Sequence, residues 1–467
     1  MFAPKIIHTE ENNMNFISKD KSFYKQFFSI YWVLVLHNVI VLCVNLADNI
    51  MIGGHSETSL AGVAAVNQVQ FIFQQIIMGC GNGLVVLGSQ YWGQDRTDEI
   101  KRISVGALYI GLAAAIVLFA AAALKPEGIL GIFTPSESII AQGSEYLRVI
   151  KYTYIIFAVT NILLASLRSV ETVKIGFYIS ILTLVVNCCI NYVLIEGHFG
   201  APELGVTGAA IGTLSARAVE LMIVICYMAF VDKKLIMRVK DLFRFDKTLF
   251  KDYCKVSSTI IIVAAMFGLS TALQSVILGH MSDSAIAANS MSSSLYQVLK
   301  VMAIGASSAA SIIIGKTIGS SNLDRLKEYT RTLQVIFLCI GAVTSISLFL
   351  LRAPILSMYK LTEETKALAN GFMLVLCATG FGTAYQMPSL IGIVQGGGDG
   401  KFVLKNDLIS IWGIVLPLSF LAAFKLGWHP IAVVFCLNSD QIFKCGAAAI
   451  KVNSYTWIKK LTRDDNQ

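Results

Sequence analysis

The feature that most constrains the fold is the recurrence of apolar stretches long enough to cross a bilayer, which takes about 20 residues of helix. The chain of 467 residues contains twelve such stretches, separated by short polar breaks. We expect them at residues 27–53, 60–91, 103–124, 143–167, 176–196, 204–231, 255–279, 285–318, 332–351, 366–394, 404–425 and 428–450. The pattern predicts an all-α integral membrane protein with twelve transmembrane helices.

The distribution of positive charge predicts the topology. The net charge of +8 alone is compatible with a nucleic-acid partner, but the Lys and Arg residues gather in alternate breaks between the apolar stretches. Breaks on the opposite side, such as those at 53–59, 197–203 and 279–284, contain none. Because basic loops stay on the cytoplasmic side, we expect a multi-pass protein of the cell (plasma) membrane with both termini cytoplasmic, and no nucleic-acid partner.

The sequence repeats itself. The segment GGHSETSLAG from Gly53 aligns with GHMSDSAIAA from Gly279, a shift of 226 residues (279 minus 53), and LRSVETVK at 167–174 resembles VQGGGDGK at 394–401. Duplicated bundles that rock against each other are typical of transporters. We predict two pseudo-symmetric six-helix bundles around a central cavity. The predicted domains are a cytoplasmic tail at 1–26, bundles at 27–231 and 255–450, a basic linker at 232–254, and a cytoplasmic tail at 451–467.

Four polar residues fall at similar depth in the first predicted bundle. Asp48 lies about five residues, or roughly 8 Å, from the outer end of its span. Asn187 and Asn191 share one face of the fifth span, and Thr213 follows in the sixth. Oxygen ligands of this kind suit a hard cation, and a carboxylate removed from water can instead carry a proton. The alternative is that these groups only bond between helices.

Other ionisable residues within the apolar stretches have simpler explanations. Asp440 and Lys444 are four residues apart, which predicts an ion pair on one helix. His37 is expected to be a hydrogen-bonded interior residue. Lys300 has no nearby partner in the sequence, so with Gln297 it either lines a cavity or pairs across helices.

The motifs resemble the multidrug and toxic compound extrusion (MATE) family over essentially the full chain. The resemblance rests on NLADNIMIGG followed by SLAGVAAVNQ, YWGQDRTDEIKR, LRSVETVK, NCCINYVLI, GHFGAPELGVTGAAIGT and QGGGDGKF. It implies two six-helix bundles around a V-shaped cavity and export of substrate in exchange for inward Na⁺ or H⁺. The cation or proton site of the family would correspond to Asp48, Asn187, Asn191 and Thr213.

The resemblance also sets expectations for partners. Small organic, cationic substrates and a monomeric carrier are expected, with no cofactor or metal beyond a transported Na⁺. The chain departs from the family pattern at Glu171 and Thr172, where Gly-Asp is usual. It also lacks the Glu that some members carry in the seventh span, so coupling is expected in the first half alone.

Two other functions fit parts of the sequence. A flippase for lipid-linked oligosaccharides or polysaccharides of the same superfamily would show a more hydrophilic, charge-lined cavity. A membrane-embedded protease is suggested by the GxGD string at Gly396–Asp399. That string lies in a predicted loop and has no second aspartate in a matching motif, so we do not expect an enzyme.

Overall fold

The computed structural model describes residues 17–132, 136–237, 240–241, 244–358 and 362–463. Residues 1–16 and 464–467 of the predicted tails, and 238–239 and 242–243 of the predicted linker, lie outside the described residues. The described chain is helical throughout and forms no strand. Twelve of its helical segments are long and apolar enough to cross a membrane, which confirms the predicted fold class.

The helices divide into two groups along the chain. The first half contains α1 (Lys21–His55), α2 (Glu57–Trp92), α3 (Thr97–Leu124), α4 (Pro126–Leu130), α5 (Glu137–Ile150), α6 (Tyr152–Ser169), α7 (Lys174–Ile195), η1 (His198–Gly200), α8 (Gly205–Cys226) and η2 (Tyr227–Val231). The second half contains α9 (Lys247–Gly279), α10 (Asp283–Gly319), α11 (Leu323–Met358), α12 (Glu363–Met387), η4 (Pro388–Gln395), α13 (Gly400–Asp407), η5 (Leu408–Val415), α14 (Leu416–Phe420), η6 (Leu421–Lys425), α15 (Pro430–Asn438) and α16 (Asp440–Asn453).

Several helices begin before the apolar stretch that predicted them. The side chain of Asp20 caps α1 by accepting from Ser22, and Asp246 caps α9 by accepting from Thr248 and Leu249. An N-cap satisfies the free N–H groups of the first turn and so fixes where the helix starts. The predicted linker at 232–254 is therefore too long at its C-terminal end, because hydropathy marks the membrane segment and not the full helix.

Some predicted spans are interrupted. The predicted span at 143–167 consists of α5 and α6, and the span at 428–450 consists of α15 and α16. The tenth span changes from α-helix to π-helix at Pro388. Proline has no N–H for the regular ladder, so a local change of helical winding is the expected response.

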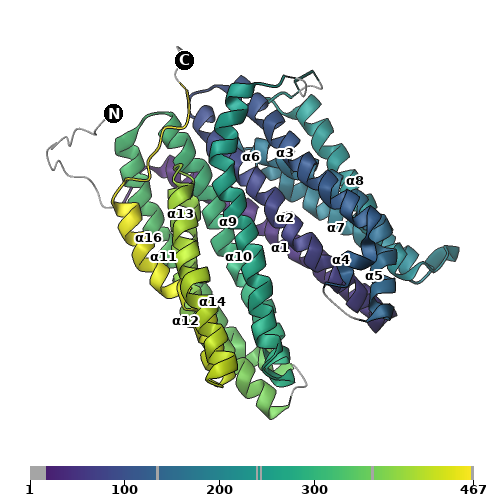
Figure 1. The fold of residues 1–467 in the computed structure, drawn as a ribbon. Coiled ribbons are helices and arrows are strands. Elements are labelled where there is room, and N and C mark those ends of the chain that lie inside the picture. Colours follow the sequence, from purple (N-terminus) through teal and green to yellow (C-terminus); the bar gives the residue numbers. More distant parts are fainter. Residues whose placement is uncertain (1–16, 133–135, 238–239, 242–243, 359–361, 464–467) are drawn as a thin grey trace.

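The two halves lie side by side and meet at one end. In Figure 1 their ribbons are close together near the two chain termini and diverge toward the opposite end. Helix α2 packs against α9 and α10, and α1 packs against α10. Glycines allow this close approach: a Cβ at Gly315 would overlap Ser89, and one at Gly83 would overlap Ser257.

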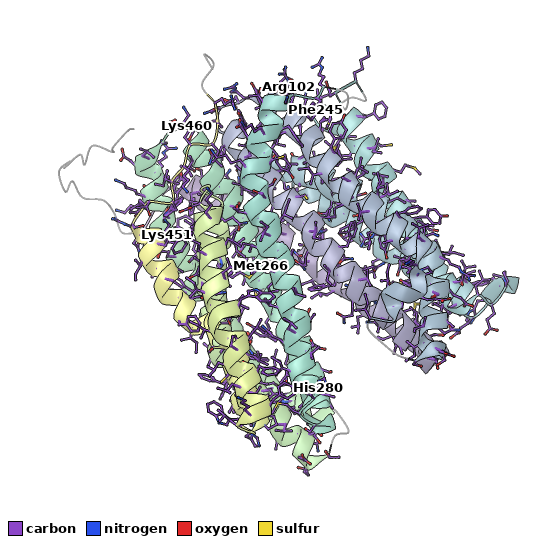
Figure 2. All side chains as sticks on the ribbon, viewed as in Figure 1. Arg102, Phe245, Met266, His280, Lys451 and Lys460 are labelled. Atoms are coloured by element: carbon purple, nitrogen blue, oxygen red, sulfur yellow. The ribbon has the colours of Figure 1, made fainter. Side chains whose placement is uncertain are left out.

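We call the end that carries the termini the terminal end. Figure 2 places Arg102 and Lys460 at this end and His280 at the opposite one. The loops of the terminal end are those whose basic residues predicted a cytoplasmic location. These basic loops therefore lie together at the terminal end.

Segments at both ends of the described chain cross from one half to the other. Before α1, the N–H of Ser18 donates to Thr332 Oγ1 at 2.8 Å, and the hydroxyl of Tyr329 donates to Asp20 Oδ2 at 2.8 Å. Both partners belong to α11 of the second half. We call residues 17–20 and 455–463 the terminal straps.

The second terminal strap lies on the first half. The side chain of Gln90 donates to the carbonyl of Lys459 at 3.0 Å and accepts from the N–H of Leu461 at 2.8 Å. Within the same strap, Trp457 is fully buried. Arg463 donates through its guanidinium to Asp252 of α9 at 3.0 Å, so this strap contacts both halves.

Candidate functional site

The structure brings the four predicted polar residues of the first half together. Asn191 Nδ2 donates to Asp48 Oδ1 at 2.6 Å and to Asn187 Oδ1 at 3.3 Å. Asn187 Nδ2 in turn donates to Thr213 Oγ1 at 3.4 Å. We call Asp48, Asn187, Asn191 and Thr213 the polar cluster; it joins α1, α7 and α8 inside the first half.

Local structure explains why the polar cluster forms. Asn187 and Asn191 lie one turn apart on α7 and are 1% and 0% exposed. Gly212 on α8 lets that helix come close to α7, because a Cβ there would overlap the side-chain oxygen of Asn191. Burial leaves these amides dependent on partners within the protein.

One acceptor in the polar cluster is unused. Asn191 Oδ1 is buried and has no hydrogen-bond partner in the described part of the chain, while its nitrogen donates twice. An unpaired buried oxygen is unfavourable unless a donor or a cation satisfies it. The donor set therefore fits a proton-bearing carboxyl or a hard cation.

Two neighbours of the polar cluster come from elsewhere in the sequence. Tyr146 of α5 lies beside Asp48 and Thr213, and no sequence pattern pointed to it. Arg217 forms an ion pair with Glu220 at 2.7 Å, as their three-residue spacing indicates. These residues place an Arg–Glu ion pair and a tyrosine hydroxyl near the carboxylate.

His37 also connects α1 to α7. Its Nδ1 lies 2.6 Å from Ser180 Oγ and 3.2 Å from the carbonyl oxygen of Gly176. Both partners hold the ring in place between the helices. The contacts are those of a hydrogen-bonded interior histidine.

The second half contains a different set of buried charges. Lys444 pairs with Asp440 at 3.1 Å, which confirms the predicted pair, and also with Asp407 of α13 at 2.7 Å. Lys300 of α10 forms no ion pair with any described residue; its ammonium group lies 5.0 Å from the ring centre of Phe267. A cation over an aromatic face retains part of its electrostatic stabilisation.

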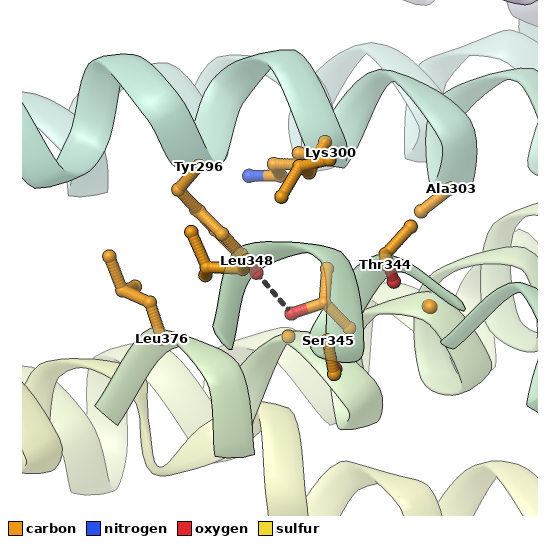
Figure 3. A pocket seen from close by; sticks show the side chains of 11 residues that line it. Tyr296, Lys300, Ala303, Thr344, Ser345, Leu348 and Leu376 are labelled. Carbon is orange, nitrogen blue, oxygen red and sulfur yellow. Dashed lines mark hydrogen bonds between the residues drawn. The ribbon is translucent and has the colours of Figure 1, made fainter. Parts of the chain in front are cut away.

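Lys300 lines a cavity within the second half. Figure 3 shows it beside Tyr296 on α10, facing Thr344 and Ser345 of α11. The hydroxyl of Ser345 is buried and has no hydrogen-bond partner among the described residues. Gln297, which was predicted with Lys300, is exposed and is not among the residues that line this cavity.

An all-helical, multi-pass membrane protein with two like halves, and with a polar cluster inside one of them, has the architecture of a membrane transporter. The family model described as MatE matches residues 34–193 and 259–421, one segment in each half. The chain belongs to this family of transporters, and it is not an enzyme.

Named relatives agree with this assignment. The chain is 25% identical over 450 residues to "Uncharacterized transporter YisQ" of Bacillus subtilis, covering 94% of this chain and 96% of that protein. It is 26% identical over 409 residues to "Probable multidrug resistance protein NorM" of Geobacillus kaustophilus, covering 85% of this chain and 87% of that protein.

Solved structures share the fold. A point mutant of the MATE transporter VcmN from Vibrio cholerae superposes with a TM-score of 0.85 at 16% identity, covering 94% of this chain and 98% of that chain. A MOP superfamily transporter from Pyrococcus furiosus gives a TM-score of 0.81 at 16% identity, covering 92% and 96%. At this identity the likeness establishes the fold alone.

Proposed function

We propose that the protein is a secondary-active multidrug exporter that exchanges an organic substrate for Na⁺ or H⁺ by alternating access. The observation that carries this proposal is the polar cluster, which places the carboxylate of Asp48 against the buried amides of Asn187 and Asn191 inside the first half. A partly buried carboxylate with an unused amide oxygen in the same cluster supports binding of a single cation or proton.

Coupling follows from the position of the polar cluster. Its hydrogen bonds join α1 to α7 and α7 to α8, so an ion that enters it changes how these helices pack. An ion can drive transport only if it binds the two conformations with different affinity. The contacts of Asp48 with Asn191 are therefore expected to differ between the two states.

The second half supplies no equivalent acidic cluster at the position of Asp48, where the repeat has Gln274. Its acids Asp407 and Asp440 both form ion pairs with Lys444. Ion coupling is thus assigned to the first half.

The proposed orientation places the terminal end in the cytoplasm. Basic loops mark that end, and the halves are in contact there, so the structure corresponds to a carrier closed toward the cytoplasm. Substrates are proposed to be small organic cations, a monomer suffices for transport, and no cofactor takes part. The relatives named as probable multidrug resistance proteins support small-molecule substrates.

The test is efflux of a fluorescent organic cation from proteoliposomes under an imposed Na⁺ or H⁺ gradient. Asp48→Asn is expected to lower gradient-driven efflux by at least roughly tenfold, because losing one charge-assisted interaction costs about 1.5–3 kcal/mol. The matched control is Asp324→Asn, which alters an exposed carboxylate in the first turn of α11 and should leave efflux unchanged.

The outcomes separate the candidate functions. Efflux that responds to one gradient and is lost in Asp48→Asn supports antiport and identifies the ion. Equal efflux in Asp48→Asn and wild type would remove Asp48 from the mechanism. Wild-type protein that moves no organic cation under either gradient would reject the exporter and favour a flippase for lipid-linked saccharides.

A further inference from the structure

A second cavity lies between the two halves, apart from the polar cluster. It measures about 30 Å³ and is lined by Asn82 and Arg168 of the first half. Its polar lining residues from the second half are Ser307, Ser308, Ser311 and Gln395. A cavity needs roughly 10–15 Å³ on this scale to hold one water, so this one admits a small ion but no organic molecule.

Arg168 is the only charged residue that lines this cavity in the described part of the chain, and it has no counterion there. Its Nε is buried without a hydrogen-bond partner, and it forms no ion pair with a described residue. A guanidinium group stays protonated in proteins. An uncompensated positive charge inside a membrane helix bundle is strongly unfavourable.

The remaining lining residues provide hydrogen-bond donors. The side chains of Asn82, Ser308 and Ser311 form no hydrogen bond with another described residue. Their amide and hydroxyl hydrogens are therefore available to a bound group. Gln395 is 4% exposed and its Oε1 has no partner among the described residues. Rotation of this amide exchanges its oxygen and nitrogen, so it can present its NH₂ group to the cavity.

The repeat explains why these two residues share one cavity. Arg168 is the second residue of LRSVETVK and Gln395 is the second residue of VQGGGDGK, the two segments that resemble each other. Equivalent positions of two pseudo-symmetric halves face each other across the junction between them. The first half contributes a charge there and the second half a neutral amide.

We propose that this cavity binds a small monovalent inorganic anion such as chloride, held by Arg168 and by donors from both halves. The anion neutralises Arg168 and links the first half to the second. Because the site is complete only while the halves are in contact here, the bound anion favours this arrangement over one that is open at the terminal end. This inference is independent of the substrate and of the coupling ion.

The test compares thermal unfolding of purified protein in sodium chloride, sodium bromide and sodium gluconate at equal ionic strength. Wild type is expected to unfold roughly 1–3 °C higher in the halides, and Arg168→Gln is expected to abolish that difference. The matched control, Arg352→Gln, removes an arginine of α11 that bonds Asn370 and the carbonyl of Phe349, and should keep the halide effect.

A second measurement covers the case in which Arg168→Gln does not fold. Crystals of wild-type protein grown in bromide should show an anomalous peak within hydrogen-bond distance of Arg168. No peak in the cavity, equal stability of wild type in all three salts, or an undiminished halide effect in Arg168→Gln would each overturn the proposal. None of these outcomes depends on transport activity, so failure of the proposed exporter function would leave them unaffected.

Discussion

Gly212 packs against the polar cluster and shapes it, although it contributes no polar atom. A side chain at this position would overlap Asn191 Oδ1, the acceptor that has no partner in the described part of the chain. The absence of a Cβ therefore determines how far α8 stands from α7 and where Asn191 lies relative to Asp48. At this position one methyl group decides the geometry of the cluster.

Gly212→Ala is expected to disturb the polar cluster. Forcing a methyl group into this contact should cost about 1–3 kcal/mol, as overpacking usually does, and should weaken gradient-driven efflux. Thermal unfolding and proteoliposome efflux measure the two effects. Gly446→Ala is the control, because a Cβ at that glycine of α16 meets no atom within 4 Å. A stable, fully coupled Gly212→Ala protein would contradict the role given to this contact.

The four residues of the polar cluster could be predicted because depth along a helix follows from residue count. Partners that packing brings in from other helices could not be predicted. Asp407 lies on a different span from Lys444, and Tyr146 reaches the cluster from α5, so no spacing in the sequence connects them. The rotation of Gln297 about α10 could not be predicted either, because it depends on neighbours that the sequence does not specify.

The first terminal strap shows how a helix cap becomes a contact between halves. Asp20 caps α1 and also accepts a hydrogen bond from Tyr329 of α11 at 2.8 Å. Hydrogen bonds from Ser22 and from Tyr329 stabilise the carboxylate and lower the pKa of Asp20 to about 2. The side chain of Asp20 thus fixes where α1 starts and where this end of α1 lies against the second half.

The lowered pKa of Asp20 leads to a prediction about how stability depends on pH. A lowered pKa stabilises the folded protein above the ordinary value of 3.8, and the contribution is lost as the pH falls through about 2. Tyr329→Phe should therefore lower stability by about 1 kcal/mol or less, by the same amount throughout pH 5–8. Thermal unfolding across that range measures it, with Tyr109→Phe as control, since Tyr109 is an exposed tyrosine.

A stability difference that changes between pH 5 and 8 would show that another group titrates at this contact. Conversely, a constant difference would exclude Asp20 as the origin of any pH dependence of transport in that range.

The sequence predicts the number and order of the membrane-spanning helices well, because the bilayer imposes a minimum apolar length. It predicts their ends less well. The start of α9 depends on the Asp246 cap, and the winding of the tenth span depends on Pro388. Both are single residues whose effect hydropathy does not register.

The whole molecule is held closed at the terminal end by small residues. Gly315 of α10 faces Ser89 of α2, and Gly93 faces the backbone of Lys316. Backbones packed this closely gain dispersion contacts but tolerate no added atoms. The same contacts must separate if the carrier is to open toward this side.

Gly315→Leu is expected to shift the population toward a state that is open at the terminal end. A cost of about 1–3 kcal/mol in the closed state changes the equilibrium by roughly 5- to 150-fold. Electron–electron distances between spin labels at Arg102 and Arg325, in a background without other cysteines, measure the shift. Gly279→Leu is the control, since a Cβ at Gly279 meets no atom within 4 Å. An unchanged distance distribution in Gly315→Leu would contradict the close-packing argument.

The terminal straps also bear on how the molecule is assembled. Residues 455–463 follow every span in the chain, so they leave the ribosome after both bundles have entered the membrane. Until then Gln90 and Asp252 lack the partners that this strap provides, and the first terminal strap and the helices are what join the two bundles. In the order of synthesis, the contacts of this strap with Gln90 and Asp252 therefore form only after the helices that it fastens together have been made.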